Sequence, residues 1–280
     1  MTQPLFDIAV AAASFFAGMV GAMIGLGGGI IITPLLVLGF GIDMRYAMGA
    51  ALCSVIATSS GAAAAYLRDG ISNMQIGMFL CIATTIGAVC GAMLAVVLDQ
   101  SLLAIIFGAA LLVTVALSLG KRSEALVEPD DSDPLAKSLR LPGTFPSDRG
   151  PVRYGVASVV PGFLIMWVAG VLSGLLGIGS GAFKVVAMDQ IMRIPFKVTT
   201  ATSNFMIGVT AAASVGIYLK KGYLDPALVA PVALGVLAGA FAGARLLTVV
   251  PVKLLRGIFL VAVTVIAVQM IARGMGISIG

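Results

Sequence analysis

The sequence predicts an all-α polytopic membrane protein built from two five-element repeats that are inverted relative to each other. Three observations lead to this prediction. Of the 280 residues, 60% are apolar and only 10% carry charge, whereas about 25% of an average soluble domain is charged. The apolar residues form runs long enough to cross about 30 Å of hydrocarbon as helix. The second half of the chain also repeats the first half at a constant spacing.

A shift of 152 positions aligns the second half with the first without a gap. The glycine cluster Gly25–Gly29 then meets Gly177–Gly181, and the Tyr-Leu-x-x-Gly pattern that starts at Tyr66 meets the same pattern at Tyr218. Shared glycines alone are weak evidence in a glycine-rich chain. The tyrosine pattern at the same spacing makes an internal repeat the simpler explanation.

Each repeat contains five apolar elements, of which the second is too short to span a bilayer. The elements run approximately over 5–24, 30–41, 45–67, 74–98 and 101–119 in the first repeat, and over 155–176, 182–193, 198–219, 226–247 and 252–272 in the second. The second element has about 12 residues, whereas a spanning helix needs about 20. Because glycines that weaken helix precede it in both repeats, we expect a short broken or re-entrant second helix.

The charges divide the chain into a first transmembrane repeat (1–119), a charged cytoplasmic linker (120–153) and a second transmembrane repeat (154–280). The linker holds half of the acidic residues and five prolines, a composition typical of a solvated segment. The first apolar run has no basic residue ahead of it. We therefore interpret it as a retained membrane helix and not as a signal peptide.

The basic residues indicate how the repeats are oriented, since Lys and Arg accumulate on the cytoplasmic side of membrane proteins. If the first two elements of each repeat form a returning hairpin, twelve basic residues lie on the linker side and four lie opposite, with Lys184 left out of the count. If these two elements together cross once, the division is ten and six. The larger asymmetry favours the hairpin and, with it, the inverted arrangement. The four opposite residues are Arg45, Lys220, Lys221 and Arg273.

The residue types exclude several kinds of site. Histidine is absent, which removes the commonest metal ligand. The cysteines Cys53, Cys81 and Cys90 lie in apolar runs without the paired spacing of a metal site. We therefore expect no metal, no cofactor and no enzymatic reaction. The net charge of +5 lies mostly in loops between spans, so it indicates orientation in the membrane and not a nucleic-acid partner.

The glycine clusters are the first candidate binding site. A helix interrupted inside the bilayer exposes unpaired N–H groups and the positive end of its dipole, and inverted repeats with such helices hold their substrate near mid-membrane. In the inverted arrangement the two helix ends converge, which suits a small anion. The alternative is that the glycines serve only close helix packing. The candidate residues are Gly27, Gly28 and Gly29 in the first repeat and Gly179, Ser180 and Gly181 in the second.

Lys184 is a cation within an apolar run, shortly after the second glycine cluster. Because a buried lysine is costly unless it is paired or hydrated, we interpret it as an electrostatic partner for an anionic substrate. The alternatives are a structural pair with Asp189 or a side chain that reaches the membrane interface. Ile32 occupies the matching position in the first repeat, so the predicted site is asymmetric.

The third element of the second repeat is unusually polar for a membrane helix. Thr200, Ser203 and Asn204 supply hydroxyls and an amide that solvate oxyanion oxygens without adding charge, and the first repeat offers Ser54 and Thr58. Hydroxyl groups equally bond back to carbonyls of their own helix, so that alternative stays open. An amide in hydrocarbon needs several partners, which makes Asn204 the stronger candidate.

Further glycines recur at four-residue spacing in the fourth elements. Small residues at this spacing are typical of close helix–helix contacts. We assign them to packing, either within one protomer or between the protomers of a homodimer. They are Gly87 and Gly91 in the first repeat and Gly235, Gly239 and Gly243 in the second.

Taken together, these motifs resemble the sulfite exporter TauE/SafE family, also called the toluene-sulfonate uptake permease family. The resemblance covers both repeats except the 120–153 linker. The second repeat departs from the pattern, because Val186 stands where Pro34 stands in the first. The segments that carry the resemblance are Gly25–Gly29, Thr33–Leu35 and Ala47–Ser60, with Gly177–Gly181 and Thr199–Asn204 as their counterparts.

The resemblance implies a bacterial inner-membrane transporter that moves sulfite, sulfonates or related small anions, often outward. We therefore expect a secondary transporter that exports a small sulfur oxyanion such as sulfite, taurine or sulfoacetate, with the anion and the lipid bilayer as its partners. A channel-like anion pathway and an importer of a related anion are alternatives. A membrane enzyme or assembly subunit is another, which the lack of a catalytic constellation disfavours.

Overall fold

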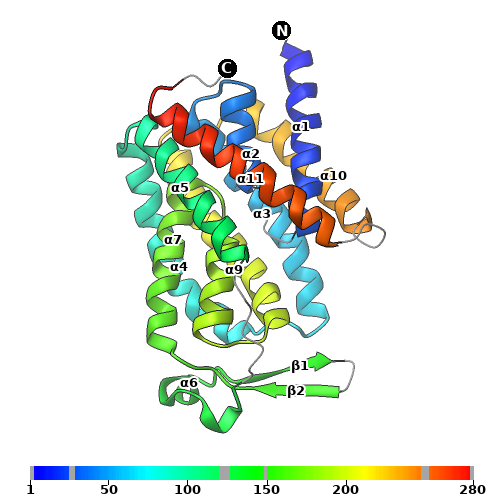
Figure 1. Cartoon of the computed structure of the whole chain (residues 1–280), viewed down its shortest axis with the longest axis vertical. Coiled ribbons are helices and arrows are strands. Elements are labelled where there is room, and N and C mark those ends of the chain that lie inside the picture. The colour runs from blue at the N-terminus through cyan, green and yellow to red at the C-terminus, as the bar shows by residue number, and fades with distance from the viewer. Residues whose placement is uncertain (1–2, 25–28, 120–126, 148–149, 247–251, 278–280) are drawn as a thin grey trace.

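The computed structural model describes residues 3–24, 29–119, 127–147, 150–246 and 252–277. Most of these residues lie in helices that run along one bundle, and a small β-hairpin lies below the bundle (Figure 1). The N-terminus lies at the other end of the bundle. We call the end that carries the β-hairpin the linker face, and the other end the opposite face.

The described chain contains eight long helices. Seven of them, all except α11, include a stretch long and apolar enough to cross a membrane. A lipid-exposed segment must satisfy its own backbone hydrogen bonds, which a helix does. The prediction of a polytopic membrane protein is confirmed. The helices are α1 (Gln3–Ile24), α3 (Met44–Arg68), α4 (Met74–Val97), α5 (Gln100–Leu119), α7 (Val159–Leu176), α9 (Phe196–Lys220), α10 (Pro226–Leu246) and α11 (Val252–Gly274).

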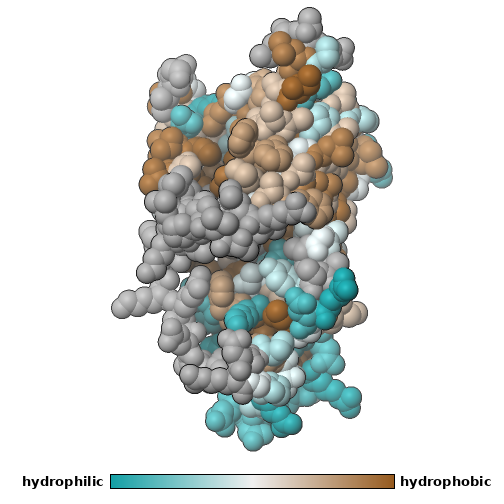
Figure 2. Space-filling model, turned by 90° about the vertical axis from the view of Figure 1, so that its right-hand side faces the viewer, coloured by the Kyte–Doolittle hydropathy of each residue, from teal (hydrophilic) through white to brown (hydrophobic). Residues whose placement is uncertain are grey.

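The molecular surface matches this composition. Figure 2 shows hydrophobic residues over most of the upper part of the molecule and hydrophilic residues concentrated at the lower end, where the linker lies. Large apolar side chains are exposed on the long helices, among them Phe16, Trp167 and Phe241. A continuous apolar surface of this kind marks contact with lipid.

The second element of each half is short, as predicted. α2 (Gly29–Pro34) continues as the π-helix η1 (Leu35–Gly39), and α8 (Gly181–Val186) continues as the π-helix η3 (Ala187–Ile191). Eleven residues of helix reach about 16 Å, which is about half of the hydrocarbon thickness. The change to π geometry does not require a proline, because the second half makes the same change with Val186 in place of Pro34.

Each short helix returns to the face from which the preceding long helix starts. At the opposite face, the rings of Phe6 in α1 and Phe40 after η1 lie 5.7 Å apart. At the linker face, the N–H of Ala157, before α7, donates to the carbonyl of Met192, after η3, at 3.0 Å. α1 with α2 and η1 therefore forms a first hairpin, and α7 with α8 and η3 forms a second hairpin. The two hairpins enter the molecule from opposite faces (Figure 1).

Glycines bring the hairpins into backbone contact with helices of the other half. α1 packs along α10, and α7 packs along α4. A Cβ atom added at Gly91 would lie 2.0 Å from the carbonyl oxygen of Val171, and one added at Gly239 would lie 1.9 Å from that of Phe15. The four-residue glycine spacing therefore serves packing within one protomer, which is one of the two alternatives that the sequence left open.

The third elements of the two halves pair with each other in antiparallel fashion, and so do the fifth elements. A Cβ atom at Gly49, near the start of α3, would lie 2.7 Å from the carbonyl oxygen of Tyr223, which follows α9. A Cβ atom at Gly274, at the end of α11, would lie 2.6 Å from the carbonyl oxygen of Ser101 at the start of α5. The α3–α9 and α5–α11 pairs are therefore both antiparallel.

The linker is folded where it is described, and it adds a small β-hairpin to a chain that is otherwise helical. It contains the 3₁₀ turn η2 (Pro129–Asp131), the helix α6 (Pro134–Ser138) and the antiparallel strands β1 (Gly143–Ser147) and β2 (Gly150–Tyr154). Ala136, Leu141 and Tyr154 are buried. These few apolar residues are hard to recognise in a polar, proline-rich sequence. The boundary expected after residue 153 lies within β2.

We predict that Gly91→Ala destabilises the fold, since the new Cβ atom would overlap the backbone of α7. Overpacking of this kind costs about 1–3 kcal/mol. The matched control is Gly216→Ala in α9, where nothing lies within 4 Å of the added Cβ atom. Thermal unfolding in detergent should give a lower melting temperature for Gly91→Ala and an unchanged or higher one for the control. Equal melting temperatures would contradict the close packing of α4 on α7.

A second prediction concerns high pH. Burial raises the pKa of Tyr154 to about 12, against the opposing effect of the hydrogen bond from Asn73. An unfolded tyrosine ionises near pH 10, so burial of the neutral ring stabilises the linker fully below about pH 10, and this contribution is lost between about pH 10 and 12. Tyr154→Phe cannot ionise and should lose less unfolding free energy over this range. Parallel pH profiles of the parent and Tyr154→Phe would refute the assignment.

Candidate functional site

The break between α7 and α8 is formed by left-handed backbone. Gly177 and Gly179 have φ angles of +69° and +70°, and Ser180 has a φ of +43°. The Ser180 hydroxyl donates to the carbonyl of Ala169 at 2.5 Å. This bond holds a non-glycine residue in a conformation that costs about 1–2 kcal/mol. Gly181 then begins α8. We call residues 177–180 the second break.

The first hairpin reaches the second break. Gly29 is the first residue of α2, and a Cβ atom added there would lie 3.2 Å from the carbonyl oxygen of Gly177 and 3.4 Å from Cα of Ile178. Residues 177–181 and Gly29 are all buried. The start of α2 and the second break therefore meet inside the bundle. Gly27 and Gly28, the other predicted residues of the first cluster, lie outside the described residues.

Two apolar side chains line this meeting point, and sequence reasoning missed both. Cγ2 of Val55 in α3 lies 2.6 Å from the added Cβ position of Gly29, and its Cγ1 lies 3.1 Å from that of Gly179. Ile207 in α9 lies 3.0 Å from the Cβ position of Gly179. The signal was present, because Val55 and Ile207 occupy matching positions in the two halves. Two apolar residues are not distinctive in a membrane helix, because most residues of such a helix are apolar.

The start of α8 supplies the electrostatics of this point. The first N–H groups of a helix have no partner within the helix, and its N-terminus carries a partial positive charge. Here that end is buried beside Val55 and Ile207. Charges interact more strongly in such apolar surroundings than in water, so this end of α8 favours an anion.

The ammonium group of Lys184 is completely buried. The residue has 0% exposure, and Nζ donates to Thr210 Oγ1 at 2.9 Å and to the carbonyl of Met206 at 3.5 Å. Thr84 Oγ1 of α4 lies 3.2 Å from Thr210 Oγ1. Both acceptors of the ammonium group are thus neutral oxygens of α9, and the hydroxyl of Thr84 links them to α4. The ammonium group does not reach a surface, which excludes the interfacial alternative.

The predicted polar residues of the third elements bond to their own helices. The Ser54 hydroxyl donates to the carbonyl of Ala51 at 2.7 Å, and that of Thr58 donates to the carbonyl of Ser54 at 3.1 Å. In α9, the Ser203 hydroxyl and the Asn204 amide both donate to the carbonyl of Thr200 at 2.9 Å. This is the local alternative that the sequence left open. It arises because a polar group in an apolar setting takes the nearest carbonyl.

The polar residues of α9 nevertheless share a face with the meeting point. Thr200, Ser203, Asn204 and Ile207 follow helical spacing, so they form one stripe, and Ile207 contacts the second break. Thr200 Oγ1 is buried and has no hydrogen-bond partner among the described residues. Buried hydroxyls are normally paired, so Thr200 is the residue of this stripe whose hydroxyl the described protein groups leave unsatisfied. Lys184 bonds to Met206 and Thr210, the next stretch of the same helix.

Comparison with known proteins identifies the family of this chain. A family model described as "Sulfite exporter TauE/SafE" matches residues 10–270. The chain belongs to this family. The match includes both hairpins, the α3–α9 pair and the linker, so the TauE/SafE resemblance seen in the motifs extends over nearly the whole chain.

Relatives agree with the family. This TauE/SafE protein is 30% identical to "Probable membrane transporter protein YunE" of Bacillus subtilis (strain 168), over 82% of this chain and 83% of that protein. It is 26% identical to "Probable membrane transporter protein YdhB" of the same organism, over 86% and 91%. No solved structure matches it. The chain is therefore a multi-pass membrane transporter of the TauE/SafE family.

We predict that Thr210→Val destabilises the protein, because it removes the hydroxyl that accepts from the buried Lys184 ammonium. Loss of this partner should lower the unfolding free energy in detergent by about 1–3 kcal/mol. The control is Thr264→Val, whose hydroxyl bonds to the carbonyl of Leu260 in its own helix and which should cost less than about 0.5 kcal/mol. In a Lys184→Met background Thr210→Val should cost little, whereas additive costs would contradict the contact.

Proposed function

We propose that this TauE/SafE protein is a secondary transporter that exports a small sulfur oxyanion, either sulfite or an organosulfonate such as taurine or sulfoacetate, across the bacterial inner membrane. One observation carries the proposal: the start of α2 and the second break meet in the buried interior, between α3 and α9. A helix start inside the bilayer is suited to a small anion. The description of the matching family supplies the sulfur-oxyanion class.

An inverted repeat explains why the two hairpins approach each other from opposite faces. α2 and α8 begin at Gly29 and Gly181, and α3 and α9 begin at Met44 and Phe196, all at the same spacing of 152. The antiparallel α3–α9 and α5–α11 pairs support the inverted relation. In transporters of this plan, one repeat rocks against the other around a fixed site at their interface.

We infer that the anion is held at the meeting point by backbone N–H groups and neutral oxygens. The start of α8, including Gly181, supplies the N–H groups, and Gly27 and Gly28 remain the residues that the sequence predicts for the first repeat. The α9 stripe supplies Thr200, Ser203 and Asn204, while Ser54 and Thr58 are the corresponding candidates on α3. Lys184 acts through its field, which reaches farther in an apolar interior than in water. A mixture of one charge with many neutral donors suits a weakly basic oxyanion.

Burial of the site favours a carrier over the channel-like alternative. Gly29 and residues 177–181 are buried, and Val55 and Ile207 close over them. An anion therefore reaches this point only after helices move, which is the behaviour of a transporter with alternating access. Saturable transport with counterflow is the corresponding kinetic signature.

The orientation supports outward movement. The positive-inside rule places the linker in the cytoplasm, with Arg45 and Arg273 at the opposite face, where Arg45 bonds to the carbonyl of Leu98 and Arg273 to that of Val37. The membrane potential favours export of an anion, because moving one negative charge out of a negative-inside cell gains about 2.3 kcal/mol per 100 mV.

We predict that proteoliposomes containing this protein take up labelled sulfite, taurine or sulfoacetate, and that Lys184→Ala and Asn204→Ala each reduce the initial rate by about tenfold or more. Lys184→Ala removes the buried charge, and Asn204→Ala removes the amide of the α9 stripe. The matched control is Ser138→Ala, on the exposed surface of α6, which should leave the rate unchanged.

The outcomes separate the parts of the proposal. Transport that survives both substitutions would remove these side chains from the site and leave the helix starts as the only recognition elements. If none of the three anions moves while the folded protein is present, the sulfur-oxyanion assignment fails.

A further inference from the structure

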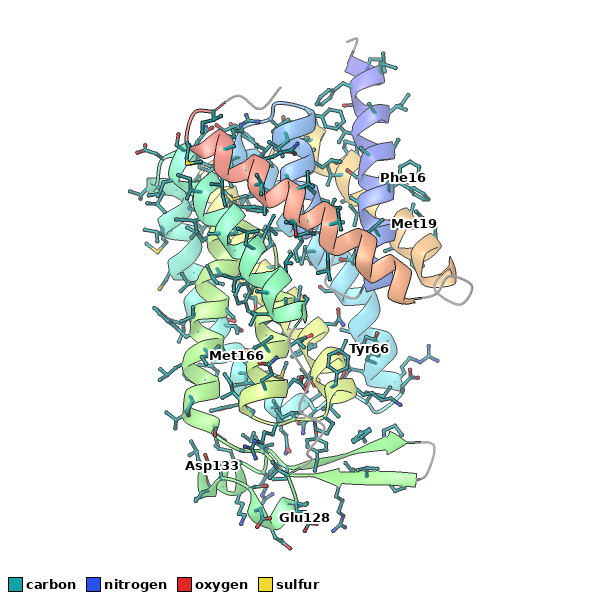
Figure 3. All side chains as sticks on the ribbon, viewed as in Figure 1. Phe16, Met19, Tyr66, Glu128, Asp133 and Met166 are labelled. Carbon is teal, nitrogen blue, oxygen red and sulfur yellow. The ribbon has the colours of Figure 1, made fainter. Side chains whose placement is uncertain are left out.

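The described part of the linker forms one folded unit at the linker face. We call residues 127–147 and 150–157 the linker module. Its two ends are joined by backbone and side-chain bonds: the N–H of Gly155 donates to the carbonyl of Val127 at 2.6 Å, and the N–H of Val156 donates to the hydroxyl of Ser132 at 3.2 Å. Figure 3 shows Glu128 and Asp133 of this module below the lower end of α7.

The linker module holds both ends of the second hairpin. One carboxylate oxygen of Asp133 accepts from the N–H of Val159, the first residue of α7, at 3.1 Å. The N–H of Asp133 donates to the carbonyl of Val156 at 2.9 Å, and the N–H of Ala157 donates to the carbonyl of Met192 at 3.0 Å. The start of α7 and the end of η3 are therefore tied to the same small unit.

Asn73 joins the linker module to the rest of the bundle. Its Nδ2 donates to Tyr154 OH at 2.8 Å and to the carbonyl of Leu141 at 3.0 Å. Its Oδ1 accepts from the N–H of Ile76 and so caps the start of α4, while its own N–H donates to Thr202 Oγ1 of α9 at 3.1 Å. One side chain and its backbone thus connect the module with α4 and α9. These bonds use the amide nitrogen of Asn73 twice as donor and its oxygen once as acceptor, so little of its hydrogen-bonding capacity is left over.

An apolar layer lies behind these hydrogen bonds. Leu141, Tyr154 and Val156 of the module are buried in one cluster with residues from the starts of α4 and α9 and from the end of the second hairpin. Its members from the bundle include Ile76, Leu80, Met188, Met192 and Ile194. The module therefore closes the space between α4, α9 and the second hairpin on the linker face.

The first hairpin is held differently at the opposite face. Arg273 of α11 donates to the carbonyl of Val37 in η1, and Phe6 packs edge-on against Phe40. These contacts come from the long helices themselves. The linker module therefore makes the two hairpins unequal, although their short helices match in length.

We propose that the linker module is a clamp that keeps the linker face closed by fixing the second hairpin against α4 and α9, and that its release opens the second break to that face, with Asn73 as the positioning residue. Opening at this face must separate Met188 and Met192 from Ile76 and Leu80, and all four lie in the cluster that the module covers. The inference rests on the proposed transport function in one respect only, which is the identity of the anion that would enter through the opened linker face.

Asn73→Asp is the sharpest variant for the test. Aspartate caps a helix as well as asparagine does, and Asp225, at the matching position of the second half, caps α10 by accepting from the N–H of Ala227 at 2.9 Å. The variant therefore keeps the cap of α4 but loses the donor to Tyr154 and Leu141. Asn73→Asp combined with Tyr154→Ala removes the second partner as well. Thr144→Ala, exposed on β1, is the control.

Cys81 is a native reporter of opening, since it lies in α4, is buried and belongs to the same cluster as Leu141 and Tyr154. In a Cys53→Ala, Cys90→Ala background in lipid nanodiscs, we measure its labelling by a charged maleimide. Trypsin cleavage at the exposed Lys137 and Arg140 reports release of the module. We expect both rates to rise about tenfold or more in the double variant and less in Asn73→Asp, as for a local opening that loses its tethers. Thr144→Ala should match the parent.

Every other result overturns the clamp. Faster cleavage with unchanged labelling makes the module a passive tether, and faster labelling with unchanged cleavage means that the cluster loosens without release. If neither rate changes in the double variant, the named contacts do not hold the module. The assay contains no anion, so a failure of anion transport in proteoliposomes leaves its result standing, and the reverse also holds.

Discussion

The close backbone contact between the start of α2 and the second break is the constraint on which the rest of the molecule depends. Gly29 approaches Gly177 so closely that an added Cβ atom would lie 3.2 Å from its carbonyl oxygen. That approach requires two helices that stop halfway and two hairpins that enter from opposite faces. It also requires left-handed residues at the turn, which is why Gly177 and Gly179 have positive φ. The proposed anion site rests on the same geometry, because a helix that starts inside the bilayer leaves its first N–H groups without partners in the helix.

The packing of the hairpins fixes this contact in place. Each hairpin belongs to one half of the chain but packs along a long helix of the other half, α1 on α10 and α7 on α4. Glycine at positions such as Gly91 and Gly239 allows backbone-to-backbone approach, which membrane helices use in place of hydrophobic burial. Movement of one hairpin would therefore involve both halves, as the proposed transport cycle requires. The linker module adds an asymmetry that the matching helices lack.

The sequence predicted the features that depend on length and composition. The short elements expected at 30–41 and 182–193 are observed at 29–39 and 181–191. They could be predicted because 12 or fewer apolar residues after a glycine cluster are too few for a spanning helix. The sequence could not predict the full burial of Lys184 or its hydrogen bond to Thr210, since Thr210 is one hydroxyl among many. The fold of the linker was missed because its anchors, Leu141 and Tyr154, are isolated in polar sequence. The sequence did not single out Asn73, because its contacts form only when the linker module, α4 and α9 come together in the fold.

The most direct test of the account locates the anion itself. We would soak crystals of the protein with bromoethanesulfonate, whose bromine marks the bound anion by anomalous scattering. The account predicts a peak beside Gly29 and the second break, with the sulfonate oxygens within hydrogen-bond distance of N–H groups at the start of α8. A peak elsewhere in a protein that transports this sulfonate, with none between the two hairpins, would contradict it.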